Sequence, residues 1–368
     1  MTYLDYSATT PIDEEVLDTF IKASKYIGNP NSLHKLGLEA KHLIDASTKQ
    51  IANILNVKEE EIIYTSGASE ANNLAIKGIE NYTNRGKHII TTQLEHSSIY
   101  GPLSYLSEKG YEVEMAPLKE GRVDIDALEK MITDDTVLVS IGAVNSETGV
   151  RQPIEEIGKI LKKYPKVIFH SDITQAVGKI KVDLTNIDMA SFAAHKFFGI
   201  KGIGALIKKE KIKLTPLIHG GKSTTIYRSG TPTTQLIASL AKALRLSYEN
   251  IDNDIKHVNN LAKKLKNSLS SYEKVYINSN EYSIGHIVNI SIIGVKPETM
   301  LHALEEDEIY ISTQSACSTG ETSKAVMALT NDIDRSSSSI RVSLSRKTTE
   351  EEIDKFLNSF DKCYKKLV

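Results

Sequence analysis

The chain has 368 residues, of which 40% are hydrophobic and 25% are charged, and its formal net charge is −2. This composition is typical of a soluble globular protein with one large domain or two of ordinary size, and the lack of a basic stripe argues against direct binding of nucleic acid. No apolar run approaches the ~20 residues needed to cross a bilayer, so a membrane protein is not expected.

The N-terminal stretch MTYLDYSATT lacks the basic and apolar regions of a signal peptide. Only two cysteines are present, Cys317 and Cys363, and two thiols cannot form a disulfide framework or a four-thiolate zinc site. Both observations favour a reducing cytoplasmic location.

The motif TSGASEANNLAIKG at residues 65–78 follows a short apolar run. Gly67 permits a tight turn, Ser69 occupies the expected N-cap position, and a helix follows. A turn that leads into a helix N-terminus can bind an anion such as phosphate, although an ordinary capped helix has the same appearance. The glycine patterns of nucleotide triphosphate and dinucleotide sites are absent.

Four apolar segments then alternate with helical patterns, which indicates an α/β fold with a mostly parallel sheet. The four segments are 87–96, 136–145, 166–172 and 189–196, and we expect strands that end at His96, Asn145, Asp172 and Lys196. Ligands of open α/β sheets bind beyond the carboxyl ends of the strands, so these side chains are candidates for one cleft. The alternative is that they are polar only because strand ends reach the surface.

The character of the sequence changes after about residue 250. Residues 257–272 predict a basic amphipathic helix, and 286–295 and 338–346 predict strands of a separate, smaller sheet. We therefore expect a large domain at 14–250 and a smaller α+β domain made of 1–13 and 251–368. The run RSSSS at 335–339 is expected to be a loop.

Lys196 is flanked by Ala193, Ala194, Phe197 and Phe198. Burial lowers the pKa of a lysine, and a neutral amine is what Schiff-base chemistry requires. Pyridoxal phosphate uses such a lysine together with an acidic residue at the pyridine nitrogen. A surface lysine that extends to solvent is the alternative.

Asp172 suits the second role, since a buried carboxylate needs a positive partner. Gln175, three residues further on, is placed to donate to the ring hydroxyl of the cofactor. The alternative for Asp172 is a turn or capping residue.

Near the C-terminus, Ile340, Val342 and Leu344 alternate with Arg341 and two serines. The alternation places Arg341 on the polar face of a strand, where its planar guanidinium suits a carboxylate ligand. A surface arginine on a half-exposed strand fits the pattern equally well.

Cys317 lies in QSACSTGETSK, a stretch of small and polar residues that predicts an accessible loop. Cys363 lies in the last predicted helix and is expected to pack at or near its apolar face.

Ten motifs occur in an order that resembles one known family: LDYSATTP, GNPNSLHKLG, TSGASEANNLAIKG, LEHSS, NSETGV, HSDITQAVGK, AAHKFFGIKGIGAL, RSGTP, QSACS and SIRVSLSRKTTEEEID. Together they resemble the cysteine desulfurases of the class V aminotransferase family, the NifS/IscS-like group. The resemblance covers nearly the whole chain.

The resemblance implies a pyridoxal-phosphate enzyme of fold type I, with a seven-stranded type of sheet in the large domain, that works as a homodimer. It implies a reaction that takes sulfur from L-cysteine, leaves L-alanine, and stores the sulfur as a persulfide on Cys317. The persulfide would pass to a sulfur-acceptor protein, either an iron–sulfur scaffold or a tRNA-thiolation enzyme.

The resemblance also assigns the cofactor-binding residues. Lys196 would hold the cofactor covalently, Asp172 would pair with the pyridine nitrogen, and His96 would stack on the ring and move protons. The remaining contacts to the ring oxygen and the phosphate would come from Gln175, Asn145, Gly67, Ala68, Ser69 and His195. Thr231 would reach the phosphate in the partner subunit.

At the substrate, Arg341 would bind the carboxylate of L-cysteine, with Asn145 as a further contact. Catalysis would rest on Cys317, Lys196 and His96.

The chain departs from the family pattern at several positions. Ala193 stands where many members have a serine that contacts the phosphate, Gln314 replaces a common glycine, and Ser146 replaces a usual asparagine. One neutral hydrogen bond is worth ~1 kcal/mol, so the cofactor should still bind. The segment after Cys317 is somewhat shorter than in the iron–sulfur enzymes, which leaves the sulfur acceptor open.

Three alternatives stay open at this point. The first is a selenocysteine lyase or another transaminase or epimerase of the same family. The second is a non-catalytic sulfur carrier or scaffold. The joint presence of six residues argues against it: Lys196, His96, Asp172, Gln175, Arg341 and Cys317. The third is a metal site at His170, Asp172 and His195, whose spacing matches no known metal motif, so no metal is expected.

Overall fold

The structure is a computed structural model that describes residues 1–80, 82, 86–313 and 322–368. Its α-helices and strands follow in chain order as β1 (Thr2–Tyr3), α1 (Glu14–Ala23), α2 (Lys35–Leu55), β2 (Ile62–Thr65), α3 (Ala68–Lys77), β3 (His88–Thr91), α4 (Ser97–Glu108), β4 (Glu112–Met115), β5 (Leu118–Lys119), β6 (Arg122–Val123), α5 (Ile125–Met131), β7 (Thr136–Ser140), α6 (Ile154–Leu161), β8 (Ile168–Asp172), β9 (Met189–Ala193), β10 (Gly204–Lys208), α7 (Thr234–Glu249), α8 (Ile251–Leu269), β11 (Val275–Ile277), β12 (Ile287–Ile292), α9 (Pro297–Glu305), β13 (Ile309–Tyr310), α10 (Lys324–Thr330), α11 (Ile333–Ser337), β14 (Ser339–Ser343) and α12 (Glu350–Leu367).

A seven-stranded sheet with the order β2-β10-β9-β8-β7-β3-β4 forms the centre of the molecule. Only β10 is antiparallel to its neighbours, and the other pairs of adjacent strands are parallel. Helices α3 and α4 pack on one face of this sheet, whereas α2, α6 and α7 pack on the other. The predicted α/β fold with a mostly parallel sheet is confirmed.

The central strands are buried because they are covered on both faces. Every residue of β7 and β9 is buried, which is why these segments are almost continuously apolar in sequence. Polar groups therefore gather where the strands end, and the carboxyl ends of β7, β8 and β9 open toward the cavity described below.

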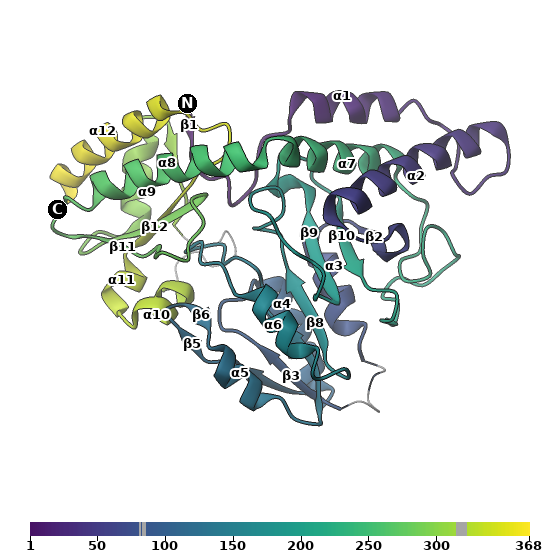
Figure 1. The fold of residues 1–368 in the computed structure, drawn as a ribbon. Coiled ribbons are helices and arrows are strands. Elements are labelled where there is room, and N and C mark those ends of the chain that lie inside the picture. The colour runs from purple at the N-terminus through teal and green to yellow at the C-terminus, as the bar shows by residue number, and fades with distance from the viewer. Residues whose placement is uncertain (81, 83–85, 314–321) are drawn as a thin grey trace.

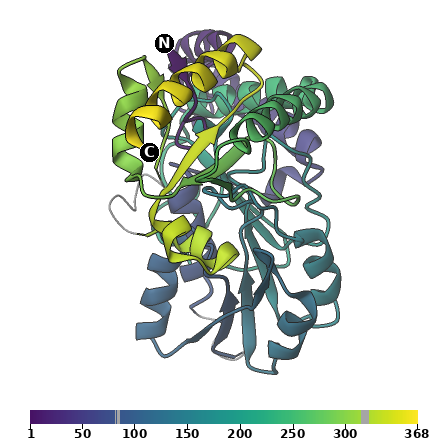
Figure 2. The same ribbon diagram turned by 90° about the vertical axis from the view of Figure 1, so that its left-hand side faces the viewer.

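A second hydrophobic cluster lies around the three-stranded antiparallel sheet β11-β12-β14. Helices α8 and α12 pack against this sheet, and both chain termini lie near it (Figures 1 and 2). The N-terminal strand β1 pairs with β13, so Leu4 joins this cluster although it is far away in sequence. Cys363 is buried in the same cluster. The division into domains at residues 13 and 250 stays a prediction.

Two local expectations were wrong. The RSSSS run is not a loop: it ends α11 and begins β14, because the side chain of Asp332 caps the helix and Ser338 donates to the carbonyl of Asp334. Ser69 is not an N-cap: it is the second residue of α3, and Gly67 occupies the capping position.

In the described part of the chain, no helix is both long and apolar enough to span a membrane.

Candidate active site

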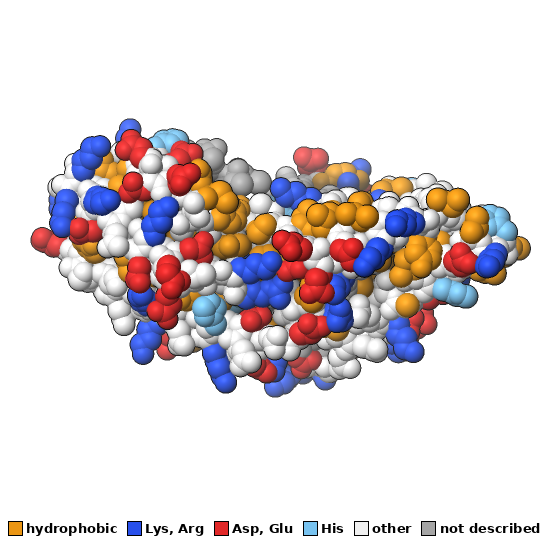
Figure 3. Space-filling view, turned by 90° about the horizontal axis from the view of Figure 1, so that it is seen from above, with side chains coloured by type: hydrophobic (Ala, Val, Ile, Leu, Met, Phe, Trp, Pro, Cys, Tyr) orange, Lys and Arg blue, Asp and Glu red, His pale blue; other side chains and the backbone are white. Residues whose placement is uncertain are grey.

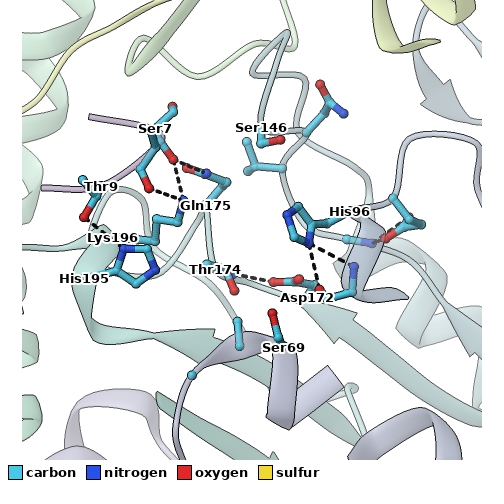
Figure 4. A pocket seen from close by; sticks show the side chains of 18 of the residues that line it. Ser7, Thr9, Ser69, His96, Ser146, Asp172, Thr174, Gln175, His195 and Lys196 are labelled. Atoms are coloured by element: carbon cyan, nitrogen blue, oxygen red, sulfur yellow. Dashed lines mark hydrogen bonds between the residues drawn. The ribbon is translucent and has the colours of Figure 1, made fainter. Parts of the chain in front are cut away.

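A cavity of about 650 Å³ opens at the carboxyl ends of the central parallel strands (Figure 4). Its volume is in the usual range for a site that binds a small molecule. Ten of the residues singled out in the sequence line it, namely Gly67, Ala68, Ser69, His96, Asn145, Asp172, Gln175, His195, Lys196 and Arg341. Cys317 lies outside the described residues. Thr231 is exposed and does not line this cavity.

The first turn of α3 forms one end of the cavity. Backbone N–H groups in the first turn of a helix have no acceptor within the helix, so those of Ala68 and Ser69 are available to an anion. A Cβ added at Gly67 would meet no atom within 4 Å, whereas one added at Gly204 would come within 2.8 Å of the Gly67 Cα. Glycine at 204 thus lets β10 approach the turn closely.

His195 lies at the same end, and its Nδ1 is 3.1 Å from the hydroxyl of Thr9. Burial lowers the pKa of His195 to about 4, and the neighbouring positive charges of Lys196 and Lys201 act in the same direction. The ring is therefore neutral at physiological pH, and it can offer an uncharged hydrogen bond to a phosphate.

Asp172 ends β8 and points into the cavity (Figure 4). The backbone N–H of Thr174 donates to Oδ1 at 2.9 Å, and the amide of Asn72 donates to Oδ2 at 2.8 Å. Both partners are neutral, and no ion pair forms at Asp172 within the described ranges. Its charge is therefore left for a positively charged ligand to balance.

Lys196 follows β9 at the end of a short 3-10 turn, Ala194–Lys196, and its amine lies across the cavity from His96 in the view of Figure 4. The amine donates to the carbonyl oxygens of Ser7 and Ala8 at 2.6 and 2.7 Å. The N-terminal segment thus orients the lysine.

Gln175 also contacts this segment, through a bond from Nε2 to the Ser7 carbonyl at 3.0 Å. The buried amine of Lys179 donates to Oε1 of Gln175 at 2.5 Å. Nε2 carries two protons, so Gln175 can present a second N–H group to a ligand. Burial holds the pKa of Lys179 well below its usual range.

The strand before His96 is shorter than expected. Strand β3 ends at Thr91, and His96 is instead the N-cap of α4, where its Nδ1 accepts the N–H of Ser98 at 3.1 Å. Burial lowers the pKa of His96, the charge of Asp172 opposes this shift, and that of Lys196 adds to it.

Asn145 likewise lies beyond the end of its strand, β7. Its Oδ1 accepts the N–H groups of Glu147 and Thr148 at 3.0 and 2.8 Å, and its Nδ2 donates to the Leu94 carbonyl at 3.1 Å. Asn145 therefore shapes the turn at 145–148, and its contact with a ligand stays a prediction.

Arg341 reaches the cavity from β14 of the smaller sheet, and its side chain is almost fully buried. Nη2 forms an ion pair with Asp5 at 2.8 Å, and Nη1 donates to the Ser146 carbonyl at 3.0 Å. Nε is buried without a partner among the residues that the structure describes. The alternative of a surface arginine is therefore wrong.

Sequence reasoning missed Glu95, which also lines the cavity. Its carboxylate accepts from the hydroxyl of Thr92 at 2.7 Å and from the N–H of Gly142 at 3.0 and 3.1 Å. Burial raises its pKa to about 7, and the nearby charge of Asp172 adds to this effect. Its neighbour His96 was the signal available, but no spacing rule assigned Glu95 a partner.

The metal hypothesis finds no support in the geometry. His170 is fully buried between Ser140 and Ser191, at 2.9 Å from each hydroxyl, so both ring nitrogens are occupied. Within the described ranges, no group of three or more metal-ligating side chains occurs.

The donor set fits pyridoxal phosphate. An amine, a carboxylate without a cation, and a helix N-terminus line one cavity, and they would serve the aldehyde, the pyridine nitrogen and the phosphate of this cofactor. Arg341 lies in the same cavity, where it can bind the carboxylate of an amino acid.

Comparison with known proteins gives one consistent result. Residues 2–356 match the aminotransferase class-V family model. The chain is 40% identical over 365 residues to a protein named cysteine desulfurase IscS from Rickettsia bellii, covering 96% of this chain and 88% of the relative.

Solved structures give the same relationship. A NifS-like protein superposes with a TM-score of 0.93 at 34% identity, over 98% of this chain and 99% of the other. A structure described as SspA in complex with cysteine has a TM-score of 0.83 at 29% identity, over 95% of this chain and the whole of the other.

Proposed function

Because the chain belongs to the class V aminotransferase family, we propose that it is a pyridoxal-phosphate-dependent cysteine desulfurase. The observation that carries the proposal is that Lys196, Asp172 and Arg341 line one cavity in a chain similar to cysteine desulfurases over nearly its whole length. The cofactor, when bound, supplies an electron sink that makes bonds at the substrate α-carbon labile.

The cofactor would be held by residues that line the cavity and that Figure 4 labels. Lys196 would bind it covalently, and Asp172 would keep its ring nitrogen protonated. Gln175 would donate to the ring oxygen through the second N–H group of its amide. The phosphate would lie on the first turn of α3, with Ser69 and His195 as side-chain donors.

The substrate would bind through its carboxylate to Arg341, which lines the cavity and carries a guanidinium suited to a carboxylate. Lys196 would remove the proton from the α-carbon, because its covalent bond to the cofactor would place its amine beside the reacting carbon. The carbon–sulfur bond of L-cysteine then breaks, a sulfur–sulfur bond forms at Cys317, and L-alanine and a persulfide are the products.

We place the second subunit of a homodimer against α1 and α2. Large apolar side chains are exposed there, as the orange patches on the right of Figure 3 show: Ile12, Leu17, Ile21, Tyr26, Ile27, Leu33, Leu36 and Leu38. Exposed apolar side chains that gather on one face are typical of a protein interface. Thr231 is exposed and would reach the phosphate of the partner's cofactor.

We further propose a large domain at 14–250, a small domain made of 1–13 and 251–368, and a cytoplasmic location. The sulfur acceptor would be an iron–sulfur scaffold or a tRNA-thiolation enzyme.

The test is to add L-cysteine to the purified protein without reductant. The expected result is L-alanine together with a mass gain of one sulfur on the peptide that carries Cys317. Cys317→Ala should keep the cofactor absorbance and give no persulfide, with Cys363→Ala as the control that retains it. A keto acid in place of alanine would indicate a transaminase, and a protein without bound cofactor would indicate a non-catalytic scaffold. Preference for selenocysteine over cysteine would indicate a lyase.

A further inference from the structure

The imidazole of His96 is held in one protonation pattern by its position as a helix N-cap. Its Nδ1 accepts the backbone N–H of Ser98 at 3.1 Å. A backbone N–H can only donate, so Nδ1 carries no proton. In the neutral ring the proton must therefore lie on Nε2.

Further hydrogen bonds connect His96 to Asp172, which also lines the cavity. The hydroxyl of Ser98 is 2.8 Å from Nδ1 of His96, and Nδ2 of Asn72 is 2.9 Å from the same hydroxyl. Nδ2 also donates to Asp172 at 2.8 Å. Because Asn72 donates to the hydroxyl, the hydroxyl proton is free to bond to Nδ1, and the bonds form one chain from Asp172 to His96.

The orientation of Asn72 is fixed by its neighbours. Rotation of its amide would place an oxygen against the Asp172 carboxylate. The observed orientation leaves Oδ1 of Asn72 fully buried and, within the described part of the chain, without a partner. A buried amide oxygen without a hydrogen bond is unfavourable, so the contacts on the Nδ2 side are strong enough to hold this orientation.

We propose that Asn72 and Ser98 are positioning residues that hold His96 as the neutral Nε2–H tautomer, so that His96 offers a hydrogen-bond donor, and not a base, to the reacting groups. The role toward substrate rests on the proposed function. Proton abstraction then falls to Lys196, which lies across the cavity from His96 (Figure 4).

The surroundings of His96 also favour the neutral ring. Burial and the charge of Lys196 lower its pKa, and the positive end of the α4 dipole also disfavours a charged ring. Asp172 opposes these effects, and Glu95 is the adjacent acidic residue in the chain. The N-cap itself requires an unprotonated Nδ1.

The experiment is nitrogen NMR of the purified full-length protein labelled at the histidine ring nitrogens, with the His96 signals assigned by their loss in His96→Gln. The expected result is an unprotonated Nδ1 and a protonated Nε2. A protonated Nδ1 in the wild-type protein overturns the proposal, and this measurement needs no variant in the hydrogen-bond chain.

A pair of substitutions tests the continuity of the chain. Asn72→Leu should shift the His96 nitrogen signals when Ser98 is present and leave them unchanged in a Ser98→Ala background. Ser98→Thr should retain the wild-type signals, and so should Ser97→Ala, a neighbouring exposed hydroxyl. Equal shifts in both backgrounds would show that Asn72 does not act through Ser98.

Failure of this inference and failure of the proposed function are separable, because the NMR measurement requires no turnover. A protein that desulfurates L-cysteine with a protonated Nδ1 refutes only the tautomer assignment. A protein with the expected tautomer and no activity refutes only the proposed reaction.

Discussion

The buried guanidinium of Arg341 and the half-buried carboxylate of Asp172 lie in one cavity, and their charges are balanced in different ways. Arg341 forms an ion pair with Asp5, whereas Asp172 is contacted by the neutral donors Asn72 and Thr174. A buried charge without an opposite partner is unfavourable, so the Asp172 end gains most from a cationic ligand. The Arg341 end is already balanced, and a substrate carboxylate must compete there with Asp5.

Exchanging each acid for its amide gives the largest expected effect. Asp172→Asn should weaken cofactor binding or activity on the order of 10²–10³-fold, because the ring nitrogen loses its charge partner. The stability of the cofactor-free protein should change little or rise. Absorbance titration with pyridoxal phosphate measures the first effect and urea unfolding the second.

Asp5→Asn is the matched control, and it should affect the stability of the protein and not the affinity for the cofactor. Cofactor affinity should be retained, and the cofactor-free protein should lose about 1–3 kcal/mol of stability because Arg341 loses its charged partner. If both amides gave the same pattern, the distinction between the two ends of the cavity would be wrong.

The next effect concerns the geometry of Arg341. Arg341→Lys keeps the charge and removes the planar fork, so kcat/KM for L-cysteine should fall about 10- to 100-fold, mainly through KM. Arg346→Lys is the control, since Arg346 pairs with Asp13 and does not line the cavity. An unchanged KM in Arg341→Lys would remove Arg341 from the substrate site.

Glu95 makes stability at the cofactor end depend on pH. Its pKa is raised from 4.5 to about 7, so the folded protein keeps a proton that the unfolded chain releases. Wild-type stability should therefore fall relative to Glu95→Gln as pH rises through this window, by about 2–3 kcal/mol between about pH 5 and about pH 8. Urea unfolding of the cofactor-free proteins at about pH 5 and about pH 8 checks this, with the exposed Glu112→Gln as control. Parallel curves for Glu95→Gln and wild type would contradict it.

The smallest effect is expected at the phosphate end. Ser69→Ala removes one hydroxyl donor and leaves the backbone N–H groups of α3, so cofactor affinity should fall only about fivefold. Equilibrium dialysis of the reconstituted protein measures the change. Complete loss of binding would mean that the side chain, and not the helix terminus, holds the phosphate.

The site residues that the sequence identified correctly are those whose position follows from a short local pattern. Asp172 and Lys196 follow short apolar strands of one sheet, and strand ends of that kind face a common cleft. The parallel fold follows from the same segments.

The sequence did not identify site residues whose contacts join segments that are distant in the chain. The Asp5–Arg341 ion pair joins residues 336 positions apart, and the Asn72–Asp172 bond joins residues 100 apart. No periodicity encodes such pairs, so Asp5, Asn72, Ser98 and Glu95 were not identified. The position of Ser69 was wrong because Gly67 caps α3 in its place. Only the resemblance to the family pointed to Cys317 and Thr231 in specific roles, and both assignments stay predictions.

The central claim is that the amine of Lys196 carries the cofactor in the cavity that Asp172 lines. Reduction of the purified protein with borohydride, followed by peptide mass analysis, tests it directly. The expected result is a pyridoxyl group on the peptide that contains Lys196 and none on the cavity lysine Lys201. An unmodified Lys196, or a label on another lysine, would contradict it.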